Sequence, residues 1–360
     1  MKPFHCDGCG NLVFFENVRC VKCQRTLGFL PQFGELSALE PAEHGVWKPL
    51  IAQAKPVLYR QCNNSLQHQV CNWMIPQGNA ASFCLSCSLN EMIPDLTVPE
   101  NLERWRRLET AKRRIIYTIL RLGLPLEIVP GKNQPALRFK FIGDPPGGPA
   151  ITTGHEDGVI TVNIAEADDV ERERRRVSLH EPYRTLLGHL RHEVAHYYWD
   201  RLIANSEWLG RFRELFGDET RDYAAALQAH YQQGAPADWQ SHYVSAYASS
   251  HPWEDWAETW AHYFHTIDTM ETAAGFGMTL RPRNHSAEHS MTADPAQANT
   301  SNTNFDTLLE NWFPLTYALN SFNRGMGLPD LYPFVLSGPA IEKLHFIHQV
   351  IEASRIKRKA

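Results

Sequence analysis

Two histidines in the middle of the chain have the spacing of a metal-binding pair. His192 and His196 lie four residues apart, and Glu193 follows the first of them. On an α-helix, side chains four residues apart lie on one face, so both imidazoles can bind a single ion. Glu193 then lies beside the same cleft, where it could hold and deprotonate a water at the metal. The pattern predicts a hydrolytic zinc site.

Such a site needs a third protein ligand, and a second helical segment offers two candidates. Apolar residues recur at three- and four-residue intervals from Trp253 to Ala261, which predicts a buried helix face. Glu254 and Glu258 share one side of this helix, where carboxylates are costly to bury without a partner. We assign Glu254 as the third ligand and Glu258 as the acceptor that orients one histidine ring. The reverse assignment stays open, and so does an exposed carboxylate pair without a metal.

The cysteines form two sets of four, all before residue 88. The first set is a pair of CxxC motifs with ten residues between them, a spacing typical of a zinc ribbon: Cys6, Cys9, Cys20 and Cys23. The second set is spread more widely: Cys62, Cys71, Cys84 and Cys87. It predicts another four-thiolate site, unless Cys62 and Cys71 are plain buried thiols. Four thiolates leave zinc no open position, so both sites are expected to be structural.

Composition restricts the partners and the compartment. The 360 residues carry a formal net charge of −5 and contain no basic strip studded with aromatic residues, so nucleic acid is not expected as a partner. No run approaches the roughly 20 apolar residues of a membrane span. The cysteine motif begins at once and leaves no room for a signal peptide, so we expect a cytoplasmic protein with reduced thiols. The oligomeric state is not predicted.

The elements around these motifs predict an α+β protein. Residues 101–123 read as an amphipathic helix whose basic face, which includes Lys112 and Arg113, we expect to be solvated. Residues 137–142 and 159–164 alternate like strands. The helix of the two histidines is predicted to begin near Pro182. Further helices are predicted over residues 305–322 and 341–351, after a polar stretch at 279–304 that reads as a flexible insert.

Several motifs together resemble known metallopeptidases. The HExxH motif followed by Glu254-x-x-x-Glu258 resembles the gluzincins, and Tyr247, seven residues before Glu254, extends the likeness to the catalytic domain of anthrax lethal factor. This resemblance implies that Tyr247 stabilises an oxyanion or helps to protonate the leaving amine. Most of the chain is also similar to a bacterial family described as putative zinc-binding metallopeptidases, in segments such as Cys71-Asn72-Trp73 and His251-Pro252-Trp253-Glu254. The likeness implies a zinc ribbon joined to a zincin-like catalytic domain, with an active-site helix, a small sheet and a helical C-terminal part.

These observations combine into one expected organisation. We expect a zinc ribbon at 1–40, a second four-cysteine module at 41–98, a catalytic domain at 99–278, the insert at 279–304 and a helical part at 305–360. One catalytic and two structural Zn²⁺ ions would serve hydrolysis of a peptide or protein substrate, with Glu193 as general base. Two alternatives are a SprT-like DNA–protein-crosslink protease and a non-catalytic adaptor stabilised by zinc.

Overall fold

The computed structural model describes residues 1–126, 135–145, 147–148, 151–178, 185–283, 291–298 and 303–355. By internal contacts the chain divides into two compact units, residues 3–179 and residues 180–360 with residues 1–2. The mixture of helices and sheets confirms the predicted α+β class. The predicted domain limits remain a prediction.

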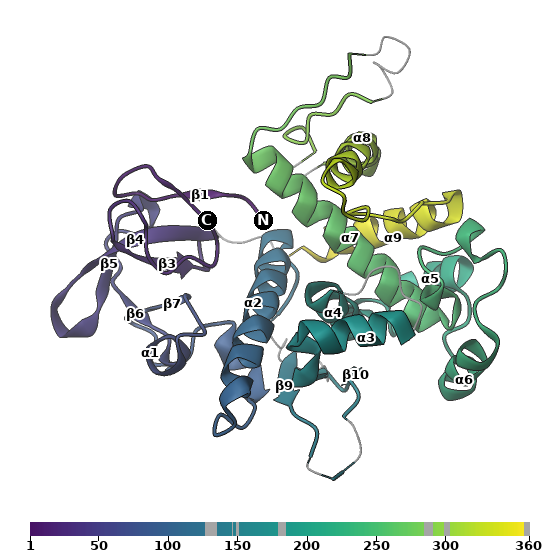
Figure 1. Ribbon diagram of the computed structural model, residues 1–360, viewed down its shortest axis with the longest axis horizontal. Helices are drawn as coiled ribbons and strands as arrows, with labels where there is room; N and C mark the ends of the chain where they lie inside the picture. The colour runs from purple at the N-terminus through teal and green to yellow at the C-terminus, as the bar shows by residue number, and fades with distance from the viewer. Residues whose placement is uncertain are drawn as a thin grey trace. The chain divides into compact units, whose positions relative to one another are not determined.

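The unit of residues 3–179 begins with antiparallel strands that carry the cysteines. A two-stranded ladder precedes a five-stranded sheet whose neighbours all pair antiparallel, drawn in purple in Figure 1. The strands are β1 (Phe4–His5), β2 (Leu12–Val13), β3 (Thr26–Leu30), β4 (Glu35–Pro41), β5 (Trp47–Pro49), β6 (Tyr59–Gln61) and β7 (Met74–Pro76), and the short helix α1 is Asn63–His68. Phe29 of β3 is fully buried against Trp73, with ring centroids 4.8 Å apart. This aromatic contact contributes to the core of the cysteine-bearing part.

A long helix and a second sheet complete the same unit. Helix α2 (Pro99–Leu122) has proline in its first turn and ends at Gly123 in the left-handed conformation, close to the predicted bounds. The four-stranded sheet has the order β10-β11-β9-β8, and its strands are β8 (Asn90–Met92), β9 (Arg138–Ile142), β10 (Gly154–Glu156) and β11 (Val159–Asn163). β9 and β11 confirm the two predicted strands. Helix α3 (Asp169–Ser178) follows.

The expectation that the basic face of α2 is solvated is wrong for two of its residues. Lys112 is 0% exposed and Arg113 is buried as well. Lys112 lies four residues after Leu108 and three before Ile115, so it falls on the apolar stripe of the helix. Its ammonium group therefore points into the protein, where it forms hydrogen bonds with other polar groups.

The unit of residues 180–360 is helical, and two of its helices form the centre. Its described helices are α4 (Leu186–Leu202), α5 (Trp208–Phe216), α6 (Tyr223–Gln233), α7 (Pro252–Gly275), α8 (Phe305–Gly325) and α9 (Gly338–Ser354). α4 and the long α7 pack together, and α9 packs on α7 (Figure 1). The fully buried rings of Trp260 in α7 and Tyr198 in α4 stack with centroids 5.2 Å apart. Across the part of the chain that the structure describes, no helix is long and apolar enough to cross a membrane.

Two predictions from the sequence concern the start of α4 and the insert at 279–304. α4 begins at Leu186, because the Thr185 side chain accepts a hydrogen bond from the Gly188 amide and caps the helix. Pro182, near which the helix was predicted to begin, lies outside the described residues. Of the predicted insert, residues 284–290 and 299–302 lie outside the described residues. Within the rest of it, Leu280 and Ala293 form an antiparallel bridge.

Candidate metal centres

Helix α4 presents the HExxH residues toward α7. His192, Glu193 and His196 are all buried. The Trp256 indole of α7 donates a hydrogen bond of 2.9 Å to the carbonyl of Ala195, in the middle of the motif. This contact fixes the register of the two helices beside the histidines, so that side chains of α7 face them.

The structure brings His192, His196 and Glu254 together. One ligand atom from each lies within 4.8 Å of the others. The two Nε2 atoms of the histidines are 3.2 Å apart, and Glu254 Oε2 is 2.9 Å from His192 Nε2. Two nitrogens bound to one tetrahedral Zn²⁺ at 2.0–2.1 Å would be about 3.3 Å apart. The three side chains therefore fit the donor set and the spacing of a zinc ion.

An oxygen of Glu254 supports this fit. Glu254 is 1% exposed, and its Oε2 accepts no hydrogen bond from the described residues, although His192 Nε2 is so close. Burial alone would raise the pKa of this carboxyl. The nearby His196 and His192 lower the pKa by a larger amount, so it lies below its ordinary value. A buried, ionised oxygen without a hydrogen-bond donor is suited to a cation.

Glu258 contacts the other nitrogen of His192. Its Oε1 is 2.7 Å from His192 Nδ1, and its Oε2 accepts a 2.7 Å hydrogen bond from the Ser245 hydroxyl. Ser245 also accepts a hydrogen bond from the Ala248 amide, which holds its side chain in place. Burial alone would lower the pKa of His192, but Glu254 and Glu258 outweigh it and raise this pKa. In the neutral tautomer with Nδ1–H directed at Glu258, Nε2 would offer its lone pair to an ion beside Glu254 and His196.

Glu193 lies beside the cluster and contacts a further histidine. His189 Nε2, one turn earlier on α4, is 3.2 Å from Glu193 Oε1. Burial raises the pKa of Glu193, but the hydrogen bond from His189 and the nearby histidines outweigh it, so the net pKa is lowered. Glu193 is thus an ionised carboxylate able to accept a proton.

Two tyrosines lie near the centre, and sequence reasoning named only one. The ring of Tyr247 lies 6.0 Å from that of His192, between centroids, and burial raises the pKa of its phenol. Tyr223 donates a 2.6 Å hydrogen bond to Glu254 Oε1. Tyr223 and Ser245 precede their carboxylate partners by 31 and 13 residues, outside any motif, so no sequence signal indicated them.

The first cysteine set also fits a zinc ion. Sulfur atoms of Cys6 and Cys23, and of Cys9 and Cys20, are 3.6 Å apart, close to the roughly 3.8 Å expected for thiolates 2.3 Å from a tetrahedral ion. Cys9 and Cys23 are half-buried, whereas the other two are buried. A hydrogen bond from the Arg25 backbone amide lowers the pKa of Cys23 to about 6.

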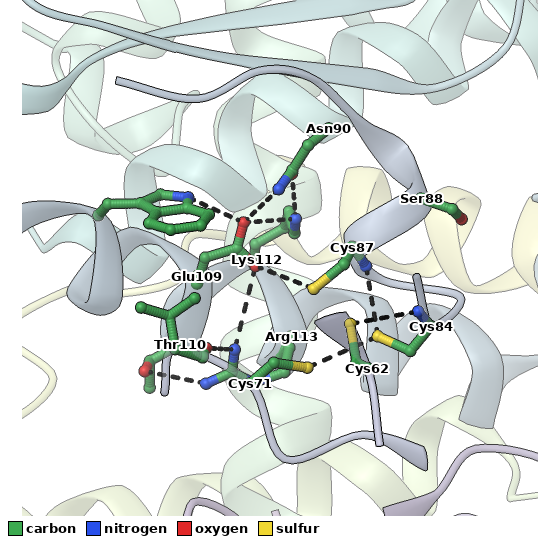
Figure 2. A network of polar contacts seen from close by, with 12 residues as sticks. Cys62, Cys71, Cys84, Cys87, Ser88, Asn90, Glu109, Thr110, Lys112 and Arg113 are labelled. Atoms are coloured by element: carbon green, nitrogen blue, oxygen red, sulfur yellow. Dashed lines mark hydrogen bonds and ion pairs between the residues drawn. The ribbon is translucent and has the colours of Figure 1, made fainter. Parts of the chain in front are cut away.

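The second cysteine set is buried throughout and adjoins a charged network (Figure 2). Cys71 and Cys84 sulfurs are 3.6 Å apart, and all four ligand atoms lie within 4.8 Å of one another.

Cys87 Sγ lies 4.0 Å from Glu109 of α2, and Lys112 Nζ is 2.9 Å from the same carboxylate. Asn90 bonds both Glu109 and Lys112. Lys112, which was predicted to be solvated, is thus part of the polar network beside this cysteine site.

Comparisons with known proteins identify the families that this chain is similar to. A family model described as "Putative zinc-binding metallo-peptidase" matches residues 101–350, and one described as "zinc-ribbon domain" matches residues 3–98. Uncharacterized proteins of Mycobacterium bovis and Mycobacterium tuberculosis are 43% identical over 357 residues, which cover 98% of this chain and 96% of each relative. No solved structure matches the chain significantly. The predicted resemblance to the family of putative zinc-binding metallopeptidases with a zinc ribbon is confirmed, whereas the likeness to gluzincins and to anthrax lethal factor remains a prediction.

Proposed function

Because the chain belongs to the family of putative zinc-binding metallo-peptidases, we propose that it hydrolyses peptide bonds with the help of a zinc ion. His192, His196 and Glu254 would hold the ion, and a peptide or protein would be the substrate. The observation that carries the proposal is the convergence of two imidazoles and one buried carboxylate, with the ionised Glu193 beside them.

The residues around the ion have distinct tasks. Zinc, when bound, supplies a Lewis acid that polarises a carbonyl and lowers the pKa of water to about 7. A carboxylate oxygen of Glu193 takes the proton of the attacking water and passes it to the departing amide nitrogen. His189 Nε2, 3.2 Å from Glu193 Oε1, holds this carboxylate in place. Glu258 and Ser245 fix the ring of His192. Tyr247 is proposed to donate a hydrogen bond to the developing oxyanion.

The first prediction tests the general base. Glu193→Gln keeps the size of the side chain but cannot accept the proton, so turnover should fall at least ~100-fold while the zinc content stays the same. The measurement is cleavage of a library of denatured proteins and peptides, with zinc counted on the same samples.

A matched control is Glu214→Gln, which removes an exposed carboxylate from α5 and should leave turnover unchanged. Full activity of Glu193→Gln would exclude this mechanism. A chain that binds only two zinc ions, both at cysteines, would instead support the adaptor alternative.

A further inference from the structure

Tyr223 connects helix α6, which lies at the surface, to the proposed metal centre. None of the eleven residues of α6 is buried. Yet the hydroxyl of Tyr223, the first residue of this helix, donates a 2.6 Å hydrogen bond to the buried Glu254. A surface helix that reaches a buried ionised carboxylate through one hydroxyl suggests a role for that hydroxyl at the carboxylate.

Neighbouring groups hold Tyr223 in this position. His251 Nε2 donates a hydrogen bond of 3.2 Å to the carbonyl of Arg221, while its Nδ1 accepts one from the Trp253 amide at the start of α7. The ring of Tyr223 lies edge-on to the ring of His251, with centroids 5.2 Å apart. The segment that leads into α6 is therefore tied to the helix that carries Glu254, and the phenol is oriented before any ion binds.

The hydrogen bond makes the two oxygens of Glu254 unequal. Oε1 accepts the Tyr223 hydroxyl and lies 3.6 Å from His196 Nε2, whereas Oε2 is 2.9 Å from His192 Nε2 and accepts no hydrogen bond from the described residues. A carboxylate that bound the ion through both oxygens would occupy two positions around it. A zinc centre with three protein ligands needs its remaining position open.

We propose that Tyr223 is a positioning residue of the metal centre: its hydroxyl occupies Oε1 and leaves Oε2 of Glu254 as the ligand atom. Glu254 would then hold the ion, when it is bound, through Oε2. This inference rests on the proposed function, since it needs the same three ligands. The motifs recognised in the sequence do not include Tyr223, since they singled out Tyr247 instead.

The test compares two tyrosines of the same helix. Tyr223→Phe keeps the ring and removes only the hydroxyl, so the zinc affinity of this centre should fall ~10–100-fold, as for other groups that orient metal ligands. Tyr231→Phe removes a hydroxyl from a side chain that is 61% exposed and should leave the affinity unchanged. Affinity is measured by competition with a chromophoric chelator. The visible spectrum of the Co²⁺-substituted protein should change in Tyr223→Phe alone, since it reports the ligand geometry.

A His192→Ala variant separates the inference from the function it rests on. If His192→Ala loses one metal ion while Tyr223→Phe binds metal like the wild type with the same Co²⁺ spectrum, the inference is overturned and the metal centre stands. Equal weakening by Tyr231→Phe would also overturn it, because the cause would then be a loosened helix. If His192→Ala binds as many ions as the wild type, the metal centre itself fails and the inference goes with it.

Discussion

His192 has a different partner at each ring nitrogen, and that difference defines the proposed centre. Nδ1 faces Glu258 and Nε2 faces Glu254, at 2.7 and 2.9 Å. The i,i+4 spacing on α7 was enough to predict that both carboxylates lie near the histidines. It assigned Glu254 as the ligand but could not exclude the reverse assignment, because the two roles depend on the hydroxyls of Ser245 and Tyr223, which lie outside the motif.

A second histidine provides a prediction about pH. His348 of α9 lies 2.8 Å from the Tyr263 hydroxyl of α7, and burial lowers its pKa from 6.5 to about 4. At pH 5 the folded chain therefore keeps His348 neutral, whereas the unfolded chain protonates it. The unfolded state binds more protons, so the free energy of unfolding falls as the pH drops from about 6.5 toward 4. His348→Gln should remove this part of the pH dependence.

The measurement is urea unfolding of the wild type and His348→Gln at pH 7 and pH 5. Glutamine can still bond Tyr263, so the variant should lose less stability between the two pH values than the wild type does. An identical loss in both proteins would show that protonation of His348 does not contribute.

At the scale of elements, the sequence predicted those whose apolar residues follow one clear period. α2, α7, β9 and β11 were found close to their predicted positions for this reason. α6 was not predicted, because it has no buried face and thus no apolar period. The burial of Lys112 was missed because lysine is usually exposed. Its place on the apolar stripe of α2 was nevertheless visible in the sequence.

The network on α2 gives a prediction of stability. Lys112→Met would leave the buried carboxylate of Glu109 without its closest cation, which should destabilise α2 by about 3–5 kcal/mol. The double variant Glu109→Gln, Lys112→Met should recover part of this loss, because the buried carboxylate and its closest cation are removed together, while Arg113, 3.9 Å from Glu109, keeps its hydrogen bond to the Val70 carbonyl. Hydrogen exchange of the α2 amides measures the opening of this helix apart from the rest of the chain.

Arg106→Ala serves as the control, since Arg106 is an exposed cation of the same helix and should change exchange little. If Lys112→Met exchanged as slowly as the wild type, the ion pair would contribute nothing to the stability of α2.

For the whole molecule, the two cysteine sites should release metal at different rates. Cys9 and Cys23 are half-buried, whereas Cys62, Cys71, Cys84 and Cys87 are all buried. A chelator should therefore take zinc first from the site of Cys6, Cys9, Cys20 and Cys23. The experiment uses His192→Ala, so that the proposed third ion does not contribute, and follows zinc release with time.

Further substitutions assign the two phases of this release. Cys9→Ser should abolish the fast phase and Cys84→Ser the slow one. Loss of the slow phase in Cys9→Ser would reverse the assignment and contradict the argument from burial.

The two family models meet between residues 98 and 101, yet the buried contacts cross that junction. β8 (Asn90–Met92), before it, is an edge strand beside β9, after it. Asn90 bonds Lys112 and Glu109, and Phe15 packs on Tyr117 of α2 with ring centroids 5.4 Å apart. Neither part could be exchanged for a counterpart from another protein without rebuilding this interior. The ribbon is therefore not an interchangeable attachment, because its interior is shared with the helix that follows it.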